Sequence, residues 1–124
     1  MSLTTLLLVG LGGMLGTLLR YGAGWWAAKQ GKPAFLATLA VNLAGCFAIG
    51  LLLGLGWPVR HETAYAFAAT GILGGLTTYS TLNVQKAMLR KATSRKTIAI
   101  YLIATYAGGL LFTAAGAGVS YLTT

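Results

Sequence analysis

Apolar residues gather into four long runs along the chain, separated by short polar or basic connections. The runs cover residues 3–26, 34–57, 63–84 and 97–122. A helix needs about 20 apolar residues to cross about 30 Å of hydrocarbon, and each run is long enough. The pattern therefore predicts an all-α membrane protein with four transmembrane helices, which form one domain over residues 1–124 and pass several times through the cell membrane.

The third run contains two adjacent glycines followed by a cluster of hydroxyl side chains. Gly74 and Gly75 weaken a helix, and hydroxyls can bond to backbone groups that the helix would otherwise satisfy. We expect an unwound break near residues 74–78, flanked by two half-helices. Such a break exposes carbonyl groups that can hold a cation and presents a helix N-terminus toward an anion. The alternative is an intact helix whose hydroxyls bond to carbonyls one turn earlier.

Composition narrows the class of protein. Hydrophobic residues make up 56% of the chain and charged residues 8%, and the mean hydropathy is +0.75. Soluble domains carry about 25% charged residues, so this composition excludes a soluble enzyme, a disordered chain and a nucleic-acid-binding tail. Glycines spaced as GxxxG at positions 12 and 16, 50 and 54, and 71 and 75 predict close helix packing, including packing against a second copy or a partner.

The charges are distributed unevenly over the predicted connections. Nine Lys and Arg residues accompany one acid, Glu62, which gives a formal charge of +8. Seven basic residues fall in the connections after the first and third spans, and Arg60 alone lies in the connection after the second. The seven are Lys29, Lys32, Lys86, Arg90, Lys91, Arg95 and Lys96. Because positive residues in short loops stay cytoplasmic, we predict that both termini lie outside and the basic loops inside.

Residue types for catalysis are scarce. The single His, His61, and the single acid, Glu62, are adjacent, and we interpret them as a charge at the start of a helix and its neighbour. An enzyme is not expected. No acid lies within the first span, where proton-coupled exporters of the small multidrug-resistance type would need one. That class is therefore a disfavoured alternative.

Two polar residues inside the spans could meet an anion. Arg20 in the first run either extends toward the basic side of the membrane or lines a positive vestibule that attracts anions. Asn42, near the middle of the second run, could offer amide donors to an anion or join neighbouring helices through hydrogen bonds. The sequence pattern leaves both alternatives open for each residue.

Three motifs together resemble the CrcB/Fluc family of fluoride channels. They are Gly-x-x-x-Arg-Tyr at residues 16–21, Thr-Leu-Ala-Val-Asn at 38–42 and Gly-Gly-Leu-Thr-Thr-Tyr-Ser-Thr at 74–81. The resemblance covers essentially the whole chain. It implies an antiparallel two-subunit channel that exports fluoride passively from the cytoplasm and holds a structural sodium ion at its interface.

The resemblance also implies roles for individual residues. The backbone carbonyls of Gly74 and Thr77 would bind sodium, and neutral carbonyl oxygens are suitable ligands for such a cation. An anion pathway would include Arg20, Thr38, Asn42, Tyr79, Ser80, Thr81, Leu82 and Gln85.

Three of these positions depart from the family pattern. Tyr79 and Leu82 stand where the family usually has two phenylalanines, and Gln85 stands for a glutamate. Tyrosine still presents a positive ring edge, whereas leucine has none. Together with the one-sided charge, these departures predict a heterodimer with an oppositely oriented paralogue. A non-conducting partner subunit of a heterodimeric fluoride channel is the alternative.

Overall fold

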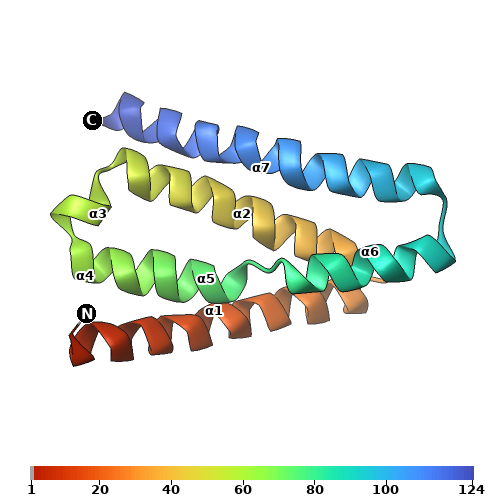
Figure 1. Ribbon diagram of the computed structural model, residues 1–124, viewed down its shortest axis with the longest axis horizontal. Helices are drawn as coiled ribbons and strands as arrows, with labels where there is room; N and C mark the ends of the chain where they lie inside the picture. Colours follow the sequence, from red (N-terminus) through yellow and green to blue (C-terminus); the bar gives the residue numbers. More distant parts are fainter. Residues whose placement is uncertain (1) are drawn as a thin grey trace.

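The computed structural model describes residues 2–124, which form an all-helical protein (Figure 1). Within this part of the chain, three helices are long and apolar enough to cross a membrane. They are α1 (Leu3–Lys29), α2 (Ala34–Gly54) and α7 (Arg95–Thr123). These helices correspond to the first, second and fourth predicted spans, so the all-helical class is confirmed.

Local sequence signals set several helix ends. Ser2 and Ser94 cap α1 and α7, because each hydroxyl oxygen accepts a hydrogen bond from the backbone N–H three residues later. Gly56 has a φ of 73°, in the left-handed region that glycine adopts most readily. The chain turns there, and α2 consequently ends at Gly54, before the predicted end of the second span at residue 57.

The third predicted span is divided into shorter pieces. After the short helix α3 (Trp57–Arg60) come α4 (Glu62–Tyr65), the π-helix η1 (Ala66–Leu73), α5 (Gly74–Leu76) and α6 (Ser80–Ala92). Figure 1 shows α4 to α6 following one path, which starts at the end of the molecule that holds both termini and leads to the opposite end. This path replaces a single continuous helix.

A break interrupts the path at residues 77–79. Helix α5 stops at Leu76, Thr77 is extended with a ψ of 156°, and helix resumes at Ser80. A break was predicted near residues 74–78, so its existence is confirmed and its position is corrected. Both glycines of the predicted break remain helical, because the interruption depends on contacts made by the residues that follow them.

Glycines bring helices of the same chain into backbone contact. A Cβ added at Gly12 would lie 2.9 Å from the Cα of Gly71 on η1, and one at Gly75 would overlap the carbonyl oxygen of Gly13 on α1. A Cβ at Gly50 on α2 would overlap the backbone of α7. The GxxxG positions thus pack α1 against η1 and α5, and α2 against α7. Packing against a second copy stays a prediction.

Large apolar side chains cover the outside of the long helices. Leu7 and Leu18 on α1 and Leu110 and Leu111 on α7 are each at least 60% exposed. The hydrophobic interior is small by comparison. Such an arrangement fits helices whose outer faces contact lipid.

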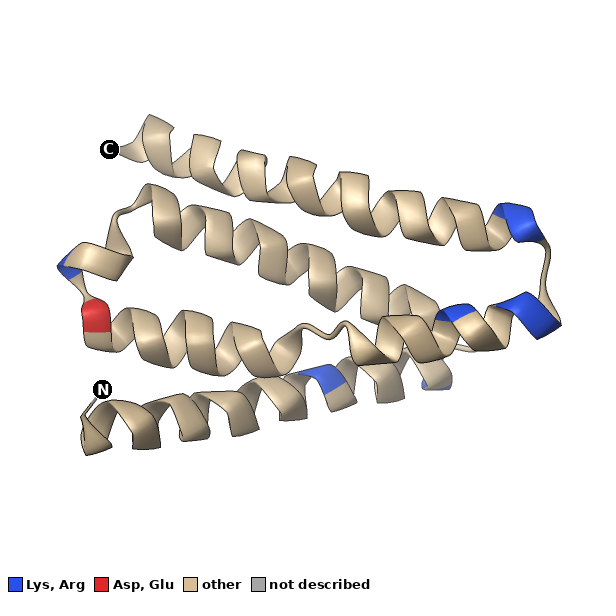
Figure 2. Ribbon diagram, viewed as in Figure 1, with Lys and Arg blue, Asp and Glu red and all other residues tan. Residues whose placement is uncertain are grey.

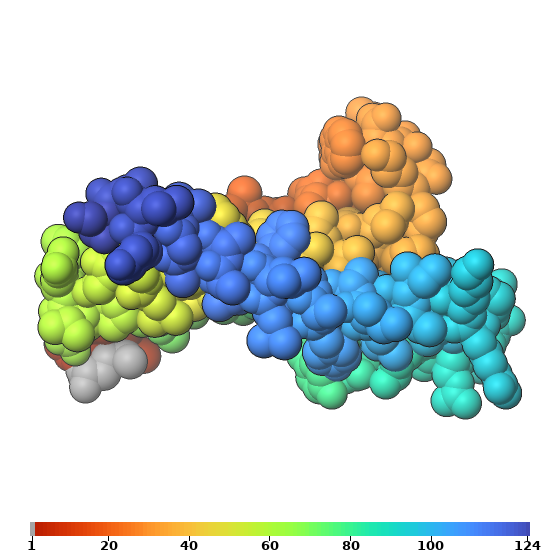
Figure 3. Space-filling model, turned by 90° about the horizontal axis from the view of Figure 1, so that it is seen from above, coloured from red at the N-terminus to blue at the C-terminus, as the bar shows by residue number. Residues whose placement is uncertain are grey.

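The two ends of the molecule differ in charge (Figure 2). Basic residues gather around the turn between α6 and α7, opposite the end that holds both termini. The connection between α1 and α2, with Lys29 and Lys32, lies toward the same basic end and stands out beside α7 in Figure 3. Glu62 and Arg60 lie at the terminal end. The orientation of these ends in a membrane remains a prediction.

Candidate functional site

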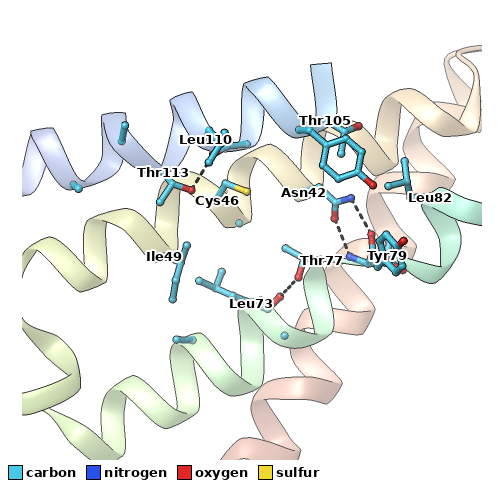
Figure 4. Close-up of a pocket in the computed structure, with 18 residues that line it drawn as sticks. Asn42, Cys46, Ile49, Leu73, Thr77, Tyr79, Leu82, Thr105, Leu110 and Thr113 are labelled. Atoms are coloured by element: carbon cyan, nitrogen blue, oxygen red, sulfur yellow. Dashed lines mark hydrogen bonds between the residues drawn. The ribbon is translucent and has the colours of Figure 1, made fainter. Parts of the chain in front are cut away.

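The break between α5 and α6 is braced by a side chain from another helix. Asn42 on α2 donates from Nδ2 to the carbonyl oxygen of Thr78 at 2.9 Å (Figure 4). Its Oδ1 accepts a hydrogen bond from the backbone N–H of Thr78 at 2.8 Å. Two bonds from one amide to one residue fix both the position and the direction of the backbone. Asn42 therefore joins helices, which is one of the two roles expected for it.

Asn42 and the hydroxyl of Thr78 each take a backbone N–H that a continuous helix would direct to a carbonyl group. In a continuous helix each carbonyl accepts a bond from the N–H four residues later, so Gly74 would pair with residue 78 and Thr77 with residue 81. The N–H of Thr78 donates to Asn42 instead. The N–H of Thr81 donates to the hydroxyl oxygen of Thr78 at 3.2 Å. The carbonyl groups of Gly74 and Thr77 are therefore released from their helical partners.

A cavity of about 990 Å³ lies beside the break, between α2, the η1–α5 segment and α7 (Figure 4). Its wall is mainly apolar and includes Ile49, Leu73 and Leu110. Gly74 and Thr77, whose carbonyl groups are released, both border it. The break thus places unpaired backbone oxygens beside a large and otherwise apolar opening.

Four predicted pathway residues meet in a second cavity, of about 340 Å³, between α1, α2 and α6. They are Arg20, Thr38, Thr81 and Gln85. The single acid of the chain, Glu62, belongs to α4 and does not line this cavity. The cavity therefore combines a positive charge with hydroxyl and amide groups and contains no carboxylate. Positively charged side chains such as Arg line anion pores.

Gln85 is oriented by a residue that the sequence reasoning missed. The hydroxyl of Tyr101 on α7 donates to Gln85 Oε1 at 2.9 Å. Tyr101 is 2% exposed, and its ring centroid lies 5.1 Å from that of Phe35. Because the amide oxygen is engaged, the N–H groups of Gln85 remain available to the cavity that it lines. A hydroxyl about one turn inside the fourth apolar run is the signal that could have indicated Tyr101.

The remaining predicted pathway residues lie elsewhere. Tyr79, which is 67% exposed, and Leu82, which is 2% exposed, line the larger cavity together with Asn42. Ser80 is exposed and lines neither cavity, and its hydroxyl lies 3.4 Å from that of Thr78. The structure therefore brings the predicted residues together in two groups, one in each cavity, and places Ser80 outside both.

Comparison with known proteins relates the chain to one family. The family model described as CrcB-like protein, Camphor Resistance (CrcB), matches residues 7–117. The chain is 40% identical over 122 residues to the fluoride-specific ion channel FluC of Pseudomonas fluorescens, covering 95% of this chain and 98% of the relative. It is 38% identical over 111 residues to FluC 2 of Lactobacillus delbrueckii subsp. bulgaricus, covering 87% and 91%. Because these relatives are named ion channels, which are not enzymes, the expectation of a non-enzyme is confirmed.

Proposed function

Because this chain belongs to the CrcB/FluC family of fluoride channels, we propose that it forms part of a passive pathway that carries fluoride out of the cytoplasm. The observation that carries this proposal is the cavity shared by Arg20, Thr38, Thr81 and Gln85. An anion leaves water only where hydrogen-bond donors replace its hydration shell. The hydroxyls and the amide supply donors, and Arg20 supplies a positive charge that offsets the cost of placing an anion in a low dielectric.

Fluoride export through this pathway needs no coupled ion. An inside-negative membrane potential favours the exit of an anion by about 2.3 kcal/mol per 100 mV. We propose that α1, α2, the broken path from α4 to α6, and α7 form four spans, with both termini outside and the basic loops in the cytoplasm. The separation of charge between the two ends supports this orientation.

The released carbonyls of Gly74 and Thr77 suit a structural sodium ion. Oxygen atoms without a hydrogen-bond donor retain their full capacity to bind a cation, and no carboxylate is needed. A second chain of the same fold, placed antiparallel, would contribute two more such oxygens. When bound, sodium would supply positive charge that holds the two chains together at the break.

The larger cavity supports a two-subunit assembly. At about 990 Å³ it has an apolar wall, and it lies beside the released carbonyls. A second chain in antiparallel orientation would cover this wall and bring its own break to the same place. The one-sided distribution of basic residues favours an oppositely oriented paralogue as that partner. Relatives in two Yersinia species are named FluC 2 and FluC 3, which fits organisms that hold several such chains.

A non-conducting subunit is the second candidate function. Leu82 is buried and offers no ring edge to an anion, and Gln85 carries no charge. In that case the partner chain would line the conducting pathway and this chain would complete the fold of the pair. Membership of a channel family and the lack of an acid within the first span both speak against the small multidrug-resistance alternative.

The two candidates are separated by fluoride efflux from liposomes, measured with a fluoride electrode. We expect the complex purified from its native membrane to pass fluoride but little chloride, and Thr81→Ala in this chain to reduce the rate. Thr123→Ala is the matched control, because that hydroxyl donates only to the carbonyl of Ser120 near the C-terminus. A complex that passes no more fluoride than protein-free vesicles would overturn the proposed channel. An unaltered rate with Thr81→Ala favours the non-conducting subunit, and full rates with this chain alone would overturn the heterodimer.

A further inference from the structure

Two lysines at the basic end are held against tryptophan rings. Lys29 Nζ lies 4.6 Å from the ring centroid of Trp25, and Lys32 Nζ lies 5.3 Å from that of Trp26. Both distances are within the range of cation–π attraction. Trp25 and Trp26 are 55% and 54% exposed, so each ring packs partly on the protein and partly faces its surroundings. Both pairs lie at the exposed C-terminal end of α1, and we call the two pairs together the Lys–Trp surface.

The turn between α1 and α2 gives this surface its shape. Gly31 has a φ of 69°, which reverses the chain directly after α1 and carries Lys32 back toward α1. The N–H of Lys32 donates to the carbonyl of Ala27 at 2.9 Å, which closes the turn. The two ammonium groups thus come from either side of one short and hydrogen-bonded turn. They are presented together instead of being spread over a flexible loop.

No carboxylate neutralises the two ammonium groups. The only acid of the chain, Glu62, belongs to α4 at the terminal end of the molecule. The indole rings attract each ammonium without removing its charge. Indoles prefer the headgroup level of a bilayer, so the Lys–Trp pairing holds the two positive charges at that same depth. The ligand that fits is an anion which resides at the headgroup level and carries apolar chains beside the exposed rings.

We propose that the Lys–Trp surface binds the phosphate headgroup of an anionic phospholipid in the leaflet at the basic end of the protein. The phosphate oxygens accept hydrogen bonds from Lys29 and Lys32, and the acyl chains lie along the exposed faces of Trp25 and Trp26. This lipid site is separate from the fluoride pathway and does not depend on the chain conducting fluoride. Each basic side chain near an anionic surface strengthens attraction by about fivefold.

The tryptophans themselves report on the site. Trp57 on α3 is the third tryptophan of the chain and belongs to the terminal end. In a Trp57→Phe background, with excitation that selects tryptophan over the six tyrosines, the tryptophan fluorescence of this chain comes only from the Lys–Trp surface. The experiment compares quenching by brominated phosphatidylglycerol with quenching by brominated phosphatidylcholine, each at the same small fraction of a phosphatidylcholine vesicle. We expect several-fold stronger quenching by the anionic lipid.

Matched variants distinguish lipid binding at the Lys–Trp surface from a general attraction of anionic lipids to the basic end of the protein. Lys29→Gln/Lys32→Gln should abolish the preference for the anionic lipid, whereas Lys91→Gln/Lys96→Gln removes the same charge at the same end of the protein (Figure 2) and should preserve it. Far-ultraviolet circular dichroism verifies that both double variants keep their helical content. Equal quenching by the two lipids, or equal loss of preference in the two double variants, would overturn the proposal. Added inorganic phosphate should leave the preference for the anionic lipid unchanged. If phosphate abolished that preference, the surface would bind a free anion instead of a lipid, and the proposal would be overturned.

Discussion

Asn42→Ala tests the cause of the helix break most directly. The change removes both hydrogen bonds to Thr78, of 2.9 and 2.8 Å. Hydrogen bonds between transmembrane helices contribute on average about 0.6 kcal/mol and at most about 1.7 kcal/mol each. Two such bonds predict that the free energy of unfolding falls by about 1–3 kcal/mol.

A second consequence concerns the released carbonyls. Without Asn42, the N–H of Thr78 becomes free to bond to the carbonyl of Gly74, as it would in a continuous helix. One oxygen available to a cation is then lost. If sodium binds at the break, replacing potassium by sodium should stabilise the unaltered protein and should have a smaller effect on Asn42→Ala.

The assay is unfolding in mixed micelles with increasing sodium dodecyl sulfate, followed by circular dichroism in sodium and in potassium. Asn83→Ala is the matched control, because Asn83 is half-buried on α6 and its side chain makes no hydrogen bond to residues 2–124. The control should shift stability by less than about 0.5 kcal/mol. Equal losses in the two variants, or no loss for Asn42→Ala, would refute the view that this amide holds the break.

Three further predictions concern packing, the smaller cavity and orientation. Gly16→Ala should cost about 1–3 kcal/mol of unfolding free energy, because its Cβ would overlap the carbonyl oxygen of Ile72. Gly22→Ala, in open space, should cost far less, and equal unfolding midpoints would contradict this packing. Tyr101→Phe should cost about 1 kcal/mol and slow fluoride efflux, since Gln85 loses its orienting bond; an unaltered electrode signal would count against that role. A reporter at the C-terminus that works only outside the cytoplasm should be active, and a cytoplasmic reading in most molecules would reverse the predicted orientation.

The long helices could be predicted from the sequence because their signals are local. Apolar runs located α1, α2 and α7, since hydrocarbon thickness demands a minimum length of apolar helix. The predicted ends of the spans were less accurate than their centres. The second span was expected to continue to residue 57, but Gly56 adopts a positive φ and ends the helix early. The π-helix η1 had no recognised sequence signal at all.

The position of the break could not be predicted from the residues around it. The two glycines of the third predicted span were expected to unwind, yet both stay helical, and Gly75 packs against the backbone of Gly13 on α1. The interruption instead follows from Asn42 and Thr78, which are 36 residues apart in sequence. No pattern within the third run specifies which backbone N–H will donate a hydrogen bond to a distant side-chain amide such as that of Asn42.

The grouping of site residues also required the fold. Arg20 was expected from its place within the first apolar run, and Thr38, Thr81 and Gln85 were expected from the resemblance to a family. The structure shows all four around one cavity. Tyr101 was missed because it lies on another helix and acts through its hydrogen bond to Gln85. A single sequence provides no means of pairing two such distant polar groups.

The glycine contacts lead to an expected order in which the chain assembles. The closest backbone contacts join α1 to η1 and α5, and α2 to α7, so each joins spans that are separated by another span. Consecutive helices leaving the ribosome therefore cannot complete these contacts as simple hairpins. The close contacts of α1 require η1 and α5, and those of α2 require α7, which is the last helix of the chain. We therefore expect insertion of individual helices to precede their tight packing, and the backbone contacts between α2 and α7 to form only after α7 has been inserted.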